Sequence, residues 1–243
     1  MYTELKLDRI AATITRLERR IQERFPESGL SRVVADLRRL ADDEEAVLVR
    51  LQRPIWILRI GGALGIAGLL AVVVLVGTIA MRVSLHFQTI TDLLQSSDSA
   101  INDIIVLSIA VFFFFSIETR VKRARALRAL HRLRSIVHVV DMHQLSKDPE
   151  HLFEPSMATA SSPQRSLTRF ELARYLDYCS EMLSLTSKLA AVYAQHLNDT
   201  VVLDAVNDIE TLAASLSNKI WQKIMILDMA IPSESTRSLR RLP

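Results

Sequence analysis

The feature that most constrains this chain is a run of 22 residues without a charge, from Ile60 to Met81 (IGGALGIAGLLAVVVLVGTIAM). A helix rising about 1.5 Å per residue reaches about 33 Å over this run, enough to cross a hydrocarbon core of about 30 Å. Hydrophobic residues make up 49% of the chain. They gather in this run and one other instead of spreading as a soluble core requires. The sequence therefore predicts a transmembrane helix within residues 54–81.

The second apolar run, Ile104 to Ile117 (IIVLSIAVFFFFSI), is shorter and has polar residues at both ends, Asp103 before it and Glu118 after it. Four consecutive phenylalanines suit contact with lipid, and a series of arginines follows directly. We predict a second span over residues 104–118, with local thinning of the bilayer absorbing its shortness. A re-entrant or interfacial helix is the alternative.

Lysine and arginine placement predicts the orientation of the two spans, because cytoplasmic flanks carry the excess of both. The connector between the spans, residues 82–103, carries Arg82 against Asp92, Asp98 and Asp103. The outer flanks are strongly basic, so both termini are expected in the cytoplasm. These basic residues are Arg50, Arg53 and Arg59 before the first span, and Arg120, Lys122, Arg123, Arg125, Arg128, Arg132 and Arg134 after the second.

The basic segment after the second span is also the expected binding site for anionic lipid headgroups, since charges beside the cytoplasmic leaflet attract them. Nucleic acid is the competing partner of a basic segment. We exclude it because these side chains lie within a few turns of the membrane and lack interleaved aromatic residues. The predicted headgroup-binding residues are Arg120, Lys122, Arg123, Arg125 and Arg128.

Small residues form a stripe on the first span: Gly61 and Gly65 make a GxxxG pair, and Gly68 and Ala71 continue it. Small side chains let helix backbones approach closely in lipid, where packing drives association. We predict that this stripe is a packing face, either against the second span or against a neighbouring copy of the chain.

Outside the spans the chain is patterned for amphipathic helices, and six Gly and seven Pro in 243 residues leave few helix breakers. The predicted fold is all-α, a transmembrane hairpin with long cytoplasmic helices that form a bundle or coiled-coil-like domain. Its parts are an N-terminal helical hairpin (1–53) broken at Pro26–Gly29, the first span (54–81), an extracytoplasmic connector (82–103), the second span (104–118), a basic juxtamembrane helix (119–146), a linker (147–167), a C-terminal helical hairpin (168–231) turning at Asn198–Thr200, and a basic tail (232–243).

Residues with catalytic or metal-binding chemistry are sparse. Cys179 is the single cysteine and falls among apolar residues, so a buried inert thiol is expected. His138 and Asp141 share a helix face, but His143 is five residues from His138, about 140° round the helix, and does not converge with them. We therefore predict no metal site, no cofactor and no enzymatic activity; no nucleotide-binding, hydrolase or potassium-filter motif occurs.

Several stretches resemble a group of bacterial inner-membrane proteins that have two spans and helical cytoplasmic parts. These stretches are RFPESGLSRV (24–33), RSIVHVVDMHQLSKDP (134–149), RYLDYCSEMLSLTSKLAAVYAQ (174–195) and NKIWQKIMIL (218–227). The resemblance implies a multi-pass protein of the bacterial inner membrane and brings no activity or site residues with it.

The function expected from these features is a non-enzymatic membrane-anchored scaffold or sensor, which oligomerises with itself and binds a cytoplasmic protein partner through its helices. The alternative is an oligomeric ion channel or membrane-perturbing effector built from two-span subunits. Copy number and ion flux discriminate between the two, since one two-span subunit cannot enclose a pore.

Overall fold

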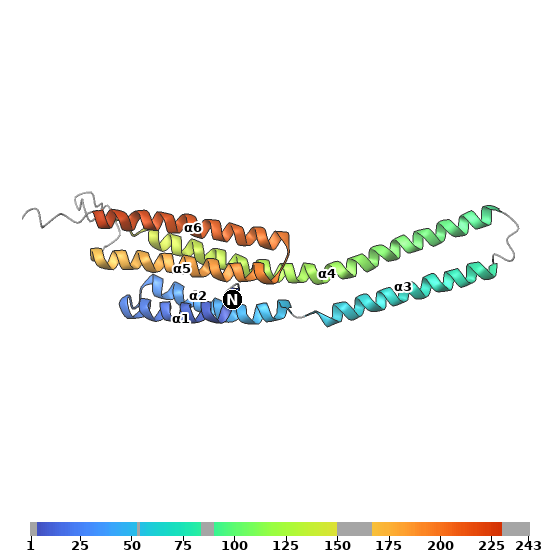
Figure 1. The fold of residues 1–243 in the computed structure, drawn as a ribbon, viewed down its shortest axis with the longest axis horizontal. Coiled ribbons are helices and arrows are strands. Elements are labelled where there is room, and N and C mark those ends of the chain that lie inside the picture. Colours follow the sequence, from blue (N-terminus) through green and yellow to red (C-terminus); the bar gives the residue numbers. More distant parts are fainter. Residues whose placement is uncertain (1–3, 53, 84–89, 150–166, 230–243) are drawn as a thin grey trace, which may run out of the picture. The chain divides into compact units, whose positions relative to one another are not determined.

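The computed structural model of the chain describes residues 4–52, 54–83, 90–149 and 167–229. Across these ranges the secondary structure consists of six α-helices, and no strand occurs in them. The predicted all-α class is confirmed. The helices are α1 (Leu7–Arg24), α2 (Gly29–Gln52), α3 (Trp56–Val83), α4 (Ile90–Leu145), α5 (Arg169–His196) and α6 (Thr200–Met229) (Figure 1).

Local capping chemistry explains where the later helices begin. Thr168 and Glu171 form a reciprocal capping box at the start of α5. The Asp199 carboxylate accepts hydrogen bonds from the backbone N–H groups of Val201 (3.1 Å) and Val202 (3.3 Å), which starts α6. The predicted turn at residues 198–200 is thereby confirmed.

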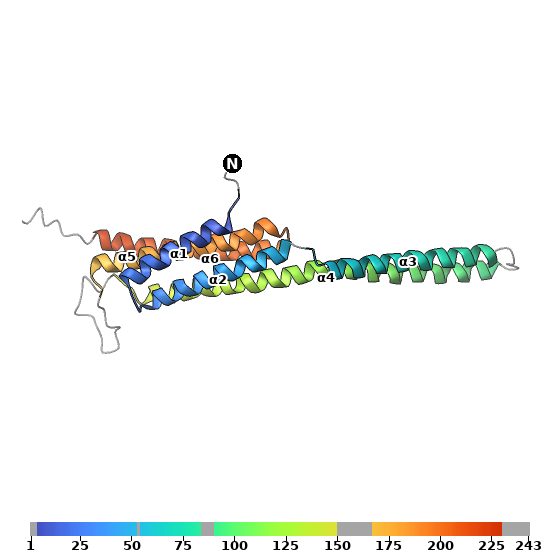
Figure 2. The ribbon, with the colours of Figure 1, turned by 90° about the horizontal axis from the view of Figure 1, so that it is seen from below.

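The chain divides into two compact units: residues 1–50 together with 126–243, here called the helical unit, and residues 51–125, here called the apolar unit. In the helical unit α5 packs along α6, and α1 packs along α5 (Figures 1 and 2). Each of these three helices buries an apolar stripe, as the amphipathic pattern predicts. These stripes include Ile10, Ile14, Leu17 and Ile21 on α1, Leu172, Leu176, Cys179 and Leu183 on α5, and Val202, Val206, Ile209 and Leu216 on α6.

The last part of α4 supplies a further buried stripe to the helical unit, consisting of Ala126, Ala129, Leu130, Leu133, Val137 and Val140. An ion pair joins α4 to α6, from Arg134 to Asp208 at 3.6 Å. The α2 helix reaches α1 through an ion pair between Arg38 and Glu18, at 3.5 Å. Polar contacts of this kind surround a core made mostly of aliphatic side chains, with Tyr193 and Met182 also fully buried in it.

The apolar unit is built differently, since its apolar side chains lie on the outside. Two described helices are long and apolar enough to cross a membrane, one over Arg59–Ile79 and one over a stretch that starts at Ile104. Only 6% of the most apolar part of the first is buried in the structure, and 0% of that of the second. Leu64 and Ile109 are 69% and 63% exposed. A core helix of a soluble protein would bury such residues. These helices therefore present an apolar surface to whatever surrounds them.

One boundary differs from the sequence-based expectation. The helix that contains the predicted second span begins at Ile90, so residues 90–103 of the predicted connector are helical. The reason is plain from the sequence, which has neither Gly nor Pro between Val83 and Pro149 to break the helix. Most of the predicted linker, residues 150–166, and the whole predicted tail, 232–243, lie outside the described residues.

Candidate functional site

An open groove of about 920 Å³ lies in the helical unit and is lined by α1, α5 and α6. One face of α5 lines it with residues three and four apart, which places them on a single side of the helix. The groove is lined on α5 by Asp177, Ser180, Glu181, Ser184, Leu185 and Lys188, on the N-terminal segment and α1 by Glu4, Leu5, Lys6, Arg9, Ile10 and Thr13, and on α6 by Trp221.

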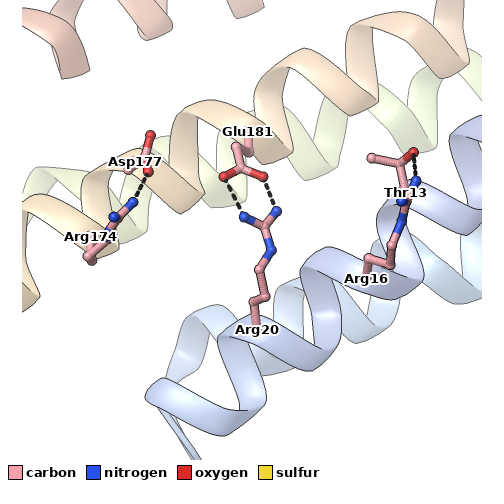
Figure 3. A network of polar contacts seen from close by, with 6 residues as sticks. All are labelled: Thr13, Arg16, Arg20, Arg174, Asp177 and Glu181. Atoms are coloured by element: carbon pink, nitrogen blue, oxygen red, sulfur yellow. Dashed lines mark hydrogen bonds and ion pairs between the residues drawn. The ribbon is translucent and has the colours of Figure 1, made fainter.

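The α1 helix is held against α5 in antiparallel register. Both terminal nitrogens of the Arg20 guanidinium on α1 donate hydrogen bonds to the Glu181 carboxylate on α5, as Figure 3 shows. The distance from Nη1 of Arg20 to Oε1 of Glu181 is 3.2 Å. Two turns along α5, Phe25 packs edge-on against the ring of Tyr175, with centroids 5.5 Å apart. The hydrogen bond from Glu181 raises the pKa of Arg20. Since both side chains are partly exposed, the pair sets the register more than it stabilises the fold.

Local polar contacts arrange the other charged groups near the groove. Arg174 donates to Asp177 at 3.0 Å (Figure 3), and Lys188 donates to the Ser184 hydroxyl at 2.5 Å. Trp221 is 59% exposed although it is large and apolar. The groove thus combines both signs of charge, hydroxyl groups and one accessible indole. This chemistry suits recognition of a helix or peptide, and its lining contains neither His nor Cys.

Cys179 lies in the core of the helical unit and not in the groove. Its thiol is completely buried, and burial raises its pKa to about 12. A thiol with such a pKa stays protonated and unreactive at neutral pH. The predicted buried thiol is confirmed.

Lys223 joins the end of α4 to α6 close to that thiol. Its ammonium group donates to the backbone carbonyl of Gln144 at 2.9 Å, where the last turn of α4 leaves carbonyls without helical partners. Burial lowers the pKa of Lys223. The Gln144 side chain donates to Asp141 at 2.7 Å. Lys223 therefore acts as a structural cap of α4.

The three residues weighed as metal ligands do not come together. His138 is exposed, and Asp141 bonds Gln144. The His143 ring lies against Gly29, where an added Cβ would be 2.1 Å from Cε1 of the ring. Within the described ranges no group of three His, Cys, Asp or Glu side chains is arranged to hold a metal ion. His143 thus has a packing role between α4 and α2.

The predicted headgroup-binding residues differ in their surroundings. Arg120, Arg125 and Arg128 are exposed. Lys122 is bound to Glu118 at 2.9 Å, and both side chains are largely covered. Arg123 is partly covered. The acid Glu118, which the sequence suggested only as a boundary residue, therefore organises part of this segment.

The predicted packing stripe on α3 has no other described helix close against it. A Cβ added at Gly61, Gly65 or Gly68 would meet no atom of the described residues within 4 Å, and Ala71 is exposed. Packing of these glycines against the second span is thus not observed. Packing against a neighbouring copy stays a prediction.

No family model, curated protein or solved structure matches this chain.

Three features escaped the sequence analysis: the groove, the Gly29–His143 contact and the carboxylate network at Glu118. The groove depends on which helices pack together, and periodicity within one helix does not show that. The Glu118 network had a visible signal, because Arg59 and Glu118 are opposite charges at the ends of the two apolar runs.

Proposed function

We propose that this chain is a non-enzymatic scaffold or sensor anchored in a bacterial inner membrane by a two-helix hairpin. The observation that carries the proposal is the contrast between the two units. The apolar unit leaves its hydrophobic helices uncovered, as a lipid-embedded anchor does, whereas the helical unit buries its own core and still offers an open groove. The basic flanks of both apolar runs support a cytoplasmic position for both termini.

Within this proposal the helical unit is a cytoplasmic bundle that binds a protein partner through the groove. The exposed Trp221 and the small Ser180 and Ser184 support this assignment, since an indole supplies contact area and small side chains allow a helix to approach. Arg120, Lys122, Arg123, Arg125 and Arg128 bind anionic headgroups beside the membrane.

The uncovered stripe of Gly61, Gly65, Gly68 and Ala71 supports homo-oligomerisation through α3. Mass measurement of the intact complex in native lipid tests this directly, because it counts copies and detects bound partners together. We expect a defined multiple of 27.4 kDa. Changing both Gly61 and Gly65 to Leu should lower the copy number. Gly77→Leu is the matched control, since it lies about 160° round the same helix from Gly61 and is equally uncovered.

A protein that is strictly monomeric in lipid and carries no bound partner would contradict the scaffold function. It would also contradict the channel function. Ion flux from the purified protein in liposomes would replace the scaffold with the alternative function. For the groove, Ser184→Trp should remove a co-purifying partner, whereas Ser215→Trp on an exposed face of α6 should retain it. Retention of the partner by both variants would place its binding outside the groove.

A further inference from the structure

The Glu118 carboxylate joins the beginning of α3 to α4 inside the apolar unit. It accepts hydrogen bonds from the backbone N–H of Ile55 at 3.4 Å and from Nε of Arg59 at 3.3 Å. It also forms an ion pair with Nζ of Lys122 at 2.9 Å. The Glu118 side chain is only 18% exposed. One acid therefore holds two cations, which leaves a net charge of +1 in one small cluster.

The two cations keep most of their hydrogen-bonding capacity. Arg59 binds Glu118 through Nε alone, so both terminal amino groups of its guanidinium stay available in the described structure, and its side chain is 58% exposed. Lys122 uses one of its three N–H donors. A guanidinium group held in one orientation can donate two parallel hydrogen bonds to two oxygens of a phosphate, and the neighbouring ammonium group adds a further donor.

The surroundings of this cluster identify the kind of molecule that carries the phosphate. Trp56 and Ile57, in the first turn of α3, are 67% and 83% exposed. An indole at the end of an apolar helix is typical of the headgroup level of a bilayer. The ligand that meets a phosphate-binding fork and apolar side chains at one place is a phospholipid.

We infer that Arg59 and Lys122, oriented by Glu118, form a defined binding site for the phosphate of an anionic phospholipid headgroup. The inference rests on the proposed function, because it requires α3 to lie in a bilayer. It differs from general attraction of basic residues to an anionic surface, which depends on net charge alone. In the defined site the acid is a positioning residue, and its loss weakens lipid binding although the cluster becomes more positive.

The test uses the full-length protein with Trp221→Phe, so that Trp56 is the remaining tryptophan of the chain's two. Quenching of Trp56 fluorescence by brominated phosphatidylglycerol, compared with brominated phosphatidylcholine, gives the preference for the anionic lipid in mixed vesicles. Glu118→Gln should lower this preference by about tenfold, which corresponds to the loss of one or two charge-assisted hydrogen bonds. Arg59→Lys should also lower it, because an ammonium group replaces the fork.

Arg39→Lys is the matched control, since it conserves charge at a 78% exposed position of α2 that belongs neither to the cluster nor to the proposed headgroup-binding residues, and it should leave the preference unchanged. Circular dichroism of each variant confirms that the helices are intact. Inorganic phosphate added to the vesicles should not compete, since it lacks the acyl chains that reach Trp56 and Ile57; effective competition would assign the site to free phosphate.

A preference that rises in Glu118→Gln, or that Arg59→Lys leaves unchanged, overturns the defined site and retains general attraction. A wild-type protein without any preference for phosphatidylglycerol contradicts the headgroup binding in the proposed function itself. The two failures are therefore distinguishable.

Discussion

Leucine residues of the two units show how the same side chain serves opposite purposes. Leu176 and Leu183 of α5 are completely buried, whereas Leu64 and Leu70 of α3 are 69% and 59% exposed. Exclusion of water stabilises the first pair. The second pair is left mostly uncovered by the described residues, and in the proposed function lipid would cover it. The helical unit buries its apolar side chains in its own core, whereas the apolar unit leaves them uncovered.

The largest expected effect comes from removing a leucine in the helical unit. Leu183→Ala should destabilise this unit by about 2–5 kcal/mol, because it leaves a cavity in a packed core. Thermal unfolding in detergent, followed by circular dichroism, measures the change. Leu70→Ala should leave the same transition unchanged. Equal destabilisation by both variants would show that the units do not differ in the way described.

Gly29→Ala tests how tightly α2 and α4 pack. The added methyl group would overlap the His143 ring, and the repacking should cost about 1–3 kcal/mol. His143→Ala in the same chain should relieve much of that cost, so a double-mutant cycle should be strongly non-additive. Additive effects of the two changes would contradict the contact.

Alkaline pH should weaken the helical unit through Cys179. Its pKa rises on folding from an ordinary value of 9.0 to about 12. The unfolded chain therefore releases this proton first. The stabilising contribution is complete below pH 9 and is lost as pH rises toward 12, by about 1.4 kcal/mol per pH unit. Denaturant unfolding at pH 8.5 and 10.5 measures the loss, and Cys179→Ala should show a smaller one. An unchanged pH dependence in the variant would contradict the burial of the thiol.

The smallest effect is expected at the surface of the helical unit. The Arg20–Glu181 pair should contribute about 0.2–1 kcal/mol, since both side chains are partly exposed. A double-mutant cycle with Arg20→Ala and Glu181→Ala measures the coupling, which should weaken as salt is added. A coupling well above this range, or one insensitive to salt, would mean that the pair is buried in the working assembly.

The sequence predicts most of the helical architecture because apolar spacing and helix breakers are local signals. Pro26–Gly29 and Asp199 mark helix ends that the structure also has. The helical residues 90–103 were missed because polar content was taken as the end of a helix, although no residue there breaks one. Hydropathy locates the membrane segment of a helix and not the helix itself.

The candidate sites were less predictable for a different reason. Asp177, Glu181 and Lys188 form one stripe on α5, but only the packing of α1 and α6 makes it part of a groove. In the same way, Arg59 and Glu118 are far apart in sequence, and the hydrogen bond between them depends on the start of α3 lying beside the middle of α4. Such contacts between elements are absent from the periodicity of any single helix.

The proposed function requires both apolar helices to cross the membrane, with the helical unit on one side and residues 82–103 on the other. Labelling with a membrane-impermeant maleimide tests it most directly, in a Cys179→Ala background carrying either Ser96→Cys or Ser215→Cys. We expect intact bacterial spheroplasts to label Ser96→Cys alone, and inverted membrane vesicles to label Ser215→Cys alone. Labelling of both cysteines from the same side of the membrane would contradict the account.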